Sequence, residues 1–289
     1  MPIARRKLIL AGLGGASALP SWGQTGTGDE RDVTWVVENF EPYFIQSGPL
    51  KGKGIGDRVN QTLIGGLPDY RHQTAHVPIL RITEGFKAGR HLAITTYLKN
   101  PADVELVHYS ITSLVVPPLE LTLRRADWQL IWRSAPQISL RRFLQSGKVI
   151  GVAGRRFYGE AISNIVADKQ HDPKGVFTQQ STHYRNLAEM VARKRIDATI
   201  GYGAELRFLE LSNPPAEPLV SVPIVENADY LYAHVAVPKT PWGEELRDQV
   251  DKVLRKQRNT PAYRAIMLDW FGHSAALEHA ITARFSSGL

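Results

Sequence analysis

The sequence contains no cysteine, and this absence excludes disulfide bonds, thiol nucleophiles and thiolate metal sites. Beyond its first residues it has no apolar run that approaches the ~20 residues of a transmembrane helix. It has no internal repeat and no low-complexity tract. A net charge of +7 over 289 residues, without an arginine–aromatic motif, does not indicate nucleic-acid binding.

The motifs of several enzyme classes are also missing. There is no Gly-x-Ser-x-Gly elbow, no His-Glu-x-x-His helix, no phosphate loop and no Gly-x-Gly-x-x-Gly turn. His72 and His76 share a face of an expected strand, but no third zinc ligand accompanies them. We therefore expect a protein that has no catalytic residues, metal or cofactor. A hydrolase that uses the carboxylates of Glu38, Glu41 and Asp103 is an alternative.

The first 23 residues are typical of a secretory signal peptide. Arg5–Lys7 form a positive segment, Leu8–Leu19 are apolar and small, and small residues precede Gln24. Residues 24–30 are polar and are expected to form a linker. We expect the mature protein to be periplasmic, and its 43% hydrophobic and 22% charged composition is ordinary for a soluble domain.

The stretch Val33–Val59 predicts a ligand-binding loop. Val33–Val37 are apolar and mostly β-branched, which indicates a buried strand. An acidic and aromatic loop follows at residues 38–43, and glycines lead into a helix over residues 56–64. Open α/β sheets bind ligands at the carboxyl ends of such strands.

Strands and helices alternate along the rest of the chain, which predicts an α/β fold. Strands are expected at residues 70–77, 91–95, 113–123, 148–153, 196–201 and 230–238, and helices at 78–89, 139–145, after Gly154, and at 184–194, 204–211, 243–256 and 260–271. Pro117 and Pro118 interrupt one expected strand, so this segment should cross between two units. Further prolines at Pro214, Pro215 and Pro218 mark a second crossing. Two lobes with a cleft between them follow from this pattern.

Nine short motifs occur in an order and spacing that resemble a known family. They are residues 38–44 (ENFEPYF), 54–57, 86–90, 100–101, 108–110, 148–154, 195–202 (RIDATIGY), 239–243 and 263–272. The sequence resembles bacterial extracellular solute-binding proteins of family 3, which have the type 2 periplasmic-binding-protein fold. The resemblance covers about residues 31 to 275.

The resemblance implies a two-lobed α/β fold with a hinge and an interlobe cleft. Lobe one would contain residues 31–118 and 230–289, and lobe two would contain residues 119–229. It also implies a monomer that captures a small-molecule ligand and delivers it to the permease of an ABC transporter. A periplasmic sensor or accessory protein that acts on a membrane partner is the alternative function.

The sequence departs from the family at the positions that hold amino acids. The arginine that grips the α-carboxylate in the family corresponds to Asp103, and the acid that holds the ammonium group corresponds to Tyr202. The Gly-Thr pair of the lobe-two anion site corresponds to Gly154-Arg155, which Arg156 follows. A carboxylate beside Asp103 would be repelled, so we do not expect a standard α-amino acid as the ligand.

The resemblance and the residue chemistry together give the expected ligand-binding residues. They are Glu41, Tyr43, Thr95, Thr96, Tyr97, Asp103, Arg155, Arg156 and Tyr202. The two arginines open an expected helix and suit an anion, or are solvated. The two acids suit hydroxyl groups or a cation, or are surface residues. The tyrosines stack on a ring or belong to the core, and the threonines donate hydroxyl groups or cap a turn.

Overall fold

The computed structural model describes residues 29–154, 156, 158–168, 175–179 and 183–288. The expected signal peptide, residues 1–23, and most of the expected linker lie outside the described residues. Within these described ranges, no helix combines the length and the apolar character needed to cross a membrane.

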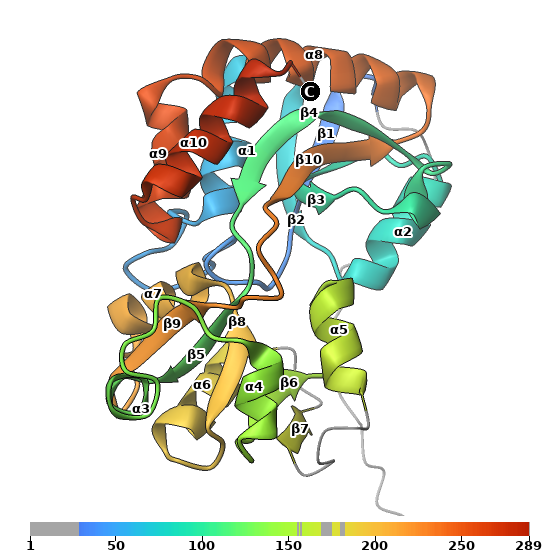
Figure 1. The fold of residues 1–289 in the computed structure, drawn as a ribbon. Coiled ribbons are helices and arrows are strands. Elements are labelled where there is room, and N and C mark those ends of the chain that lie inside the picture. Colours follow the sequence, from blue (N-terminus) through green and yellow to red (C-terminus); the bar gives the residue numbers. More distant parts are fainter. Residues whose placement is uncertain (1–28, 155, 157, 169–174, 180–182, 289) are drawn as a thin grey trace, which may run out of the picture.

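The strands form two separate mixed sheets, one in each half of the molecule (Figure 1). The first sheet has the order β2-β1-β3-β10-β4 and contains β1 (Asp32–Val37), β2 (Arg71–His76), β3 (Leu92–Leu98), β4 (Val107–Val116) and β10 (Leu231–Pro238). The second has the order β7-β6-β8-β5-β9 and contains β5 (Glu120–Arg124), β6 (Ile150–Ala153), β7 (Val176–Gln179), β8 (Ala198–Gly201) and β9 (Leu219–Pro223). In each sheet three parallel strands continue into an antiparallel pair.

Helices cover both sheets (Figure 1). The first half contains α1 (Ile55–Gly66), α2 (Ile79–Lys87), the short 3-10 helix η1 (Pro101–Asp103), α8 (Pro241–Gln257), α9 (Pro261–Phe271) and α10 (Ala275–Ser286). The second half contains α3 (Arg125–Leu130), α4 (Leu140–Gln145), α5 (Glu160–Ala167), α6 (Tyr184–Ala192) and α7 (Gly203–Ser212).

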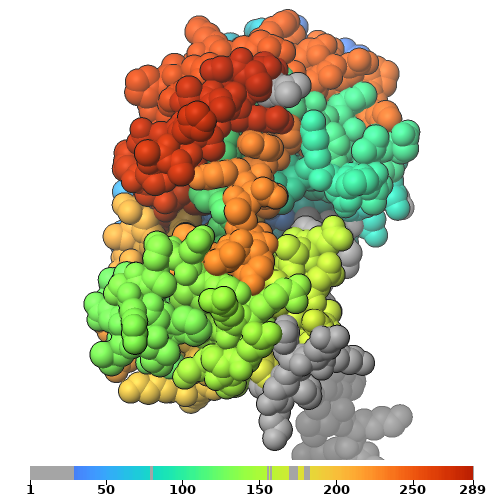
Figure 2. Space-filling model, in the orientation of Figure 1, coloured from blue at the N-terminus to red at the C-terminus, as the bar shows by residue number. Residues whose placement is uncertain are grey.

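Two connections join the halves. The first runs from β4 to β5 through Pro117 and Pro118, and the second runs from β9 to β10. Proline has no backbone N–H to donate to a sheet ladder, so the proline pair ends one strand and the chain enters the other sheet. Figure 2 shows the residues that follow β9, in orange, bridging the narrow waist between the halves. We propose the boundaries 31–118 with 230–289 for lobe one and 119–229 for lobe two.

The largest apolar core cluster extends through both lobes. It contains Trp35 and Trp270 of the first lobe together with Leu187 and Phe208 of the second. The rings of Phe208 on α7 and Trp270 on α9 lie 6.2 Å apart. The lobes therefore share buried apolar surface on the side where α7 meets α9.

The sequence pattern missed elements of several lengths, including the 12-residue helix α10. It did not predict β7, β9, α3 or α10, and it treated residues 100–109 as irregular, where the structure has η1 and the beginning of β4. The expected helix after Gly154 begins only at Glu160, because Gly159 has a φ of +80° that ends any helical geometry before it. The expectation that Arg156 opens a helix was wrong for this reason.

Candidate functional site

The site is built on the loop that follows β1. The last core residues of this strand include the fully buried Trp35, and the loop at residues 38–43 leaves the sheet immediately after them. The carboxylate of Asp57, in the first turn of α1, accepts hydrogen bonds from the backbone N–H groups of Ile45 at 2.9 Å and Gly54 at 3.1 Å. Helix α1 therefore fixes the segment between the loop and itself.

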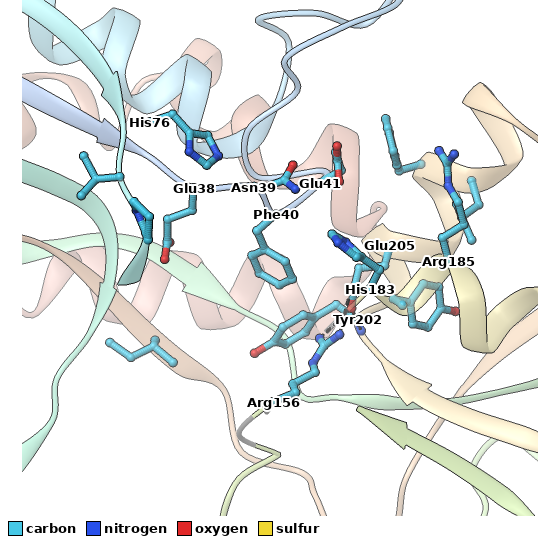
Figure 3. Close-up of a pocket in the computed structure, with 16 residues that line it drawn as sticks. Glu38, Asn39, Phe40, Glu41, His76, Arg156, His183, Arg185, Tyr202 and Glu205 are labelled. Atoms are coloured by element: carbon cyan, nitrogen blue, oxygen red, sulfur yellow. Dashed lines mark hydrogen bonds and ion pairs between the residues drawn. The ribbon is translucent and has the colours of Figure 1, made fainter. Parts of the chain in front are cut away.

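A cavity of about 600 Å³ lies between the lobes at this loop (Figure 3). The first lobe contributes Glu38, Asn39, Phe40, Glu41, His76, Val77, Pro78 and Leu98, and the second contributes Arg156, His183, Tyr184, Arg185, Tyr202, Glu205, Phe208 and Leu209. Its volume is that of a typical small-molecule site, and its lining mixes apolar side chains with a few charged groups. A ligand in this cavity would contact both lobes.

A buried ion pair crosses the second-lobe wall of the cavity. The guanidinium of Arg156 donates to both carboxylate oxygens of Glu205, at 2.8 and 2.7 Å. The two side chains are only 10% and 4% exposed. Burial disfavours the charged guanidinium, but the adjacent Glu205 carboxylate outweighs this effect and raises the pKa of Arg156. The guanidinium and the carboxylate thus form a bidentate pair whose charges offset each other.

Aromatic rings surround this ion pair. The guanidinium of Arg156 lies 5.3 Å from the ring of Tyr202, 5.6 Å from Phe40 and 5.7 Å from Tyr158. Since Phe40 belongs to the first lobe, its contact with Arg156 spans the cleft (Figure 3). Glu205 also accepts a hydrogen bond from the backbone N–H of Tyr202 at 2.8 Å, which caps α7. The pair is held in place from both lobes.

The first-lobe wall carries two further carboxylates, Glu38 and Glu41. Glu38 follows the last residue of β1, and burial raises the pKa of its carboxyl group. Neither acid has a hydrogen-bond or ion-pair partner among the described residues. The carboxylate charge on this wall is therefore uncompensated by the described part of the protein.

Three of the expected ligand-binding residues line the cavity: Glu41, Arg156 and Tyr202. Tyr43 is buried in the core, where its ring stacks on Phe40 at 5.0 Å and approaches Tyr202 at 6.4 Å. It supports the loop from behind. Arg155 lies outside the described residues.

The structure does not bring the other expected residues to the described cavity wall. Thr95 is fully buried and donates its hydroxyl hydrogen to Asn60 at 2.8 Å, so it is unavailable to a ligand there. Tyr97 donates to the carboxylate of Asp103 at 2.7 Å, so this acid already has a partner. Thr96, between Thr95 and Tyr97, is half-buried and also lies outside the described lining.

Sequence reasoning missed several lining residues, among them Phe40, His76, His183, Arg185 and Glu205. Phe40 belongs to the loop at residues 38–43 that the sequence predicts to bind the ligand, so its aromatic ring could have been included among the expected lining residues. Glu205 follows Tyr202 by three residues, which is the spacing of a helix-capping acid. That spacing predicts the hydrogen bond to Tyr202, but not the pairing with Arg156, which is 49 residues distant in sequence.

No protein-family model matches the sequence, and no curated protein matches it. Solved structures do match. The probable amino-acid ABC transporter extracellular-binding protein ytmK from Bacillus subtilis is 14% identical, with a TM-score of 0.63 over 83% of this chain and 97% of that chain. The second substrate-binding domain of Lactococcus lactis GlnP, in its open conformation, is 13% identical, with a TM-score of 0.61 over 85% of this chain and 97% of that chain.

A mutant of ArgBP from T. maritima is also similar, with 15% identity and a TM-score of 0.58 over 84% of this chain and 96% of that chain. At such low identity these likenesses establish the fold alone. The chain has the two-lobed α/β fold of these binding proteins, and the prediction of the type 2 periplasmic-binding-protein fold is confirmed.

Proposed function

We propose that the protein captures a small polar solute in the cavity between its lobes and delivers it to the permease of a membrane transporter. The observation that carries this proposal is a cavity of about 600 Å³ whose wall is divided between the two lobes. A ligand that contacts both lobes favours their closure around it, because closure adds contacts that the open form lacks. Two proteins of the same fold are a probable amino-acid ABC transporter extracellular-binding protein and a putative L-cystine ABC transporter.

The expected export agrees with this role. A signal peptide at residues 1–23 would deliver the mature protein to the periplasm, where it would meet the solute and the permease. We propose that it acts there as a monomer without a cofactor and without catalysis. The alternative of a hydrolase has less support, because Asp103 bonds to Tyr97 and only Glu38 and Glu41 of the three candidate acids line the cavity.

The proposed ligand is not a standard α-amino acid. Asp103 and Tyr202 stand where the resembling family has its carboxylate-binding arginine and its ammonium-binding acid. The more buried of the two described arginines that line the cavity, Arg156, already donates both of its bidentate hydrogen bonds to Glu205. A ligand carboxylate would have to replace that partner, and Glu205 would then be left buried and unpaired.

The contact of Phe40 with Arg156 across the cleft favours a second candidate function. A cleft that the protein partly fills itself suits a periplasmic accessory or sensor protein that contacts a membrane partner. Such a protein needs two lobe arrangements more than it needs a transported ligand.

A thermal-shift screen of the mature protein tests the two candidates. The panel should contain amino acids, amines, sugars, dicarboxylates and phosphate compounds. A ligand at 100 times its dissociation constant stabilises the folded protein by about 2.7 kcal/mol, which raises the unfolding midpoint by several degrees. We expect at least one compound outside the standard α-amino acids to do so.

Two variants identify the cavity as the binding site. Leu98→Trp places a large ring in the cavity wall and should abolish the shift. Leu130→Trp adds the same ring at a site where the leucine is 81% exposed, and it should leave the shift unchanged. No shift with any compound would instead favour the accessory protein, and turnover of a compound would favour the hydrolase.

A further inference from the structure

The described cationic groups of the cavity are poorly placed to hold a carboxylate. Arg156 donates two hydrogen bonds to the carboxylate of Glu205, and the pair carries no net charge. Arg185 lines the cavity but is an exposed residue in the first turn of α6, so water and salt screen its charge. Within the described lining, a ligand anion would therefore meet no unpaired buried cation.

The carboxylates of the opposite wall, in contrast to the paired Arg156, have no counter-charge among the described residues. Glu38 and Glu41 both line the cavity, and neither has a partner among the described residues. Burial raises the pKa of Glu38, which means that the site penalises its ionised form. A ligand cation placed against Glu38 would remove that penalty, whereas a ligand anion would increase it.

The remaining walls are apolar or aromatic. Val77, Pro78 and Leu98 lie on the first lobe, and Phe208 and Leu209 lie on the second. The ring of Phe40 is labelled near the centre of the lining residues in Figure 3. Such walls suit the alkyl or ring body of a ligand, and aromatic faces attract cations.

We propose that the cavity selects organic cations that lack a carboxylate, with the ligand ammonium or guanidinium group on Glu38 and its apolar body between the lobes. This inference rests on the proposed function and names the ligand class of the same site. The Arg156–Glu205 pair acts as a built-in substitute for the charges of a zwitterion, so the ligand supplies only the positive charge that Glu38 lacks.

Pairs of compounds that differ only by a carboxylate test this inference. Agmatine and arginine, cadaverine and lysine, and histamine and histidine are titrated calorimetrically into the mature protein. We expect at least one amine to bind at least tenfold more tightly than the amino acid of its pair. An amino acid that binds as tightly as its amine, or more tightly, overturns the inference.

The outcome also separates this inference from the proposed function. If no amine binds in either experiment but a compound of another class in the thermal-shift panel does, the cation class is wrong and solute binding stands. If no compound in either experiment binds, both fail.

The role of Glu38 has its own test. Glu38→Gln keeps the size of the side chain and removes its charge, so we expect it to weaken the best amine at least tenfold without lowering the unfolding midpoint. Glu84→Gln makes the same change at an exposed position of α2 in the same lobe, and its affinity should match that of the wild type. Equal affinities of the two variants would show that the cation does not bind on Glu38.

Discussion

Arg156 and Glu205 are each costly to bury alone, because a charge loses the stabilising hydration of water. Their two short hydrogen bonds offset much of this cost, and the rings of Tyr202, Phe40 and Tyr158 add cation–π attraction. Removing one partner should therefore lower the stability of the protein by far more than the net stabilisation that the intact pair provides.

Glu205→Gln should destabilise the protein by about 3–5 kcal/mol, since it leaves the guanidinium of Arg156 buried without a counter-charge. The double variant Arg156→Met with Glu205→Gln should recover most of this loss, because no buried charge remains. Urea unfolding measures both. Glu189→Gln is the control: its partner Arg193 is exposed, and the loss should stay below about 0.5 kcal/mol. A double variant less stable than Glu205→Gln would contradict the argument.

His234 is buried and Glu120 is half-buried, and the titration of these two groups should have opposite effects on stability. His234 is 2% exposed, and burial lowers its pKa to about 4, although its ring nitrogen Nδ1 lies 2.7 Å from the carbonyl of Ser110. Glu120 lies at the start of β5, beside the first connection between the lobes, and burial raises its pKa to about 7.

The two groups predict opposite pH effects on stability. Below pH ~6.5 His234 becomes protonated in the unfolded chain but not in the folded protein. The contribution of His234 to the free energy of unfolding therefore falls by up to about 3 kcal/mol as the pH drops toward 4. Between pH ~4.5 and 7 the folded protein keeps a proton on Glu120 that the unfolded chain has lost. The Glu120 contribution therefore falls, by a similar amount, as the pH rises.

Urea unfolding between pH 4 and 8 separates these effects. The stability difference between wild type and His234→Asn should be largest near pH 7 and shrink toward pH 4. The difference between wild type and Glu120→Gln should be largest near pH 4.5 and shrink toward pH 7. Differences that do not vary with pH would mean that neither group titrates differently in the folded protein.

The limits of sequence-based prediction are clearest for these side chains. Glu41, Arg156 and Tyr202 were identified because they lie next to motifs that mark strand ends. The partner of Arg156 was not identified, because it is fixed by the packing of segments 49 residues apart. The sequence pattern predicted that the third strand ends at Thr95, but β3 continues to Leu98. Thr95 is therefore a buried mid-strand residue, and its hydroxyl donates to Asn60 rather than to a ligand.

At the scale of elements, the segment from β1 to α1 depends on close backbone approach at Gly54. A β-carbon at this position would lie 2.5 Å from the carbonyl oxygen of Tyr43 and 2.6 Å from that of Pro42. These carbonyls accept hydrogen bonds from the start of α1, at Ile55 and Gly56. A larger residue at position 54 would therefore push the loop that carries Glu38 and Glu41 away from its helix.

Gly54→Ala should destabilise the protein by about 1–3 kcal/mol, the usual cost of overpacking, and should weaken ligand binding. Gly65→Ala, within the same helix α1, is the matched control, because no atom lies within 4 Å of its added β-carbon. It should stabilise the protein by about 0.5–1 kcal/mol, as alanine is the better helix former. Thermal unfolding checks both signs, and equal shifts would refute the role of Gly54.

The strength of the apolar pattern, more than length, decided which elements could be predicted. Strands β6 and β8, of four residues each, were predicted, whereas the 12-residue helix α10 was not. Helix α8 shows its buried side at Leu246, Val250 and Leu254, which repeats at helical spacing. Strands β7 and β9 contain four and five residues, and their stability comes from their neighbours in the sheet. Such segments carry too little pattern of their own to be recognised before the sheet is known.

At the scale of the whole molecule, the lobes are joined by more than their two connections. Phe208 and Trp270 extend the largest core cluster from one lobe into the other, and the contact of Phe40 with Arg156 adds a second bridge at the cavity. Burial of large rings is worth about 2–3 kcal/mol each. Contacts of this size stabilise the approach of the lobes without a ligand, so part of the free energy of closure is internal to the protein.

Phe208→Ala should open the ligand-free protein, because it removes the ring that faces Trp270 across the lobe boundary. Small-angle X-ray scattering should give a larger radius of gyration than that of the wild type, which should be about 18 Å for a compact chain of roughly 260 residues. Phe143→Ala is the control: that ring is equally large and lies in a core cluster confined to the second lobe. Both variants should lose about 3–5 kcal/mol, but only Phe208→Ala should expand.

The same variant links closure to binding. If the wild-type lobes are held together by their own contacts, opening them lowers the fraction of molecules whose cavity is complete, and the apparent affinity falls by that fraction. Phe208 also lines the cavity, so lost contacts with the ligand would lower affinity too. A saturating ligand should then return the radius of gyration of Phe208→Ala to the wild-type value. An unchanged radius in both the free and the bound variant would show that closure does not depend on this contact.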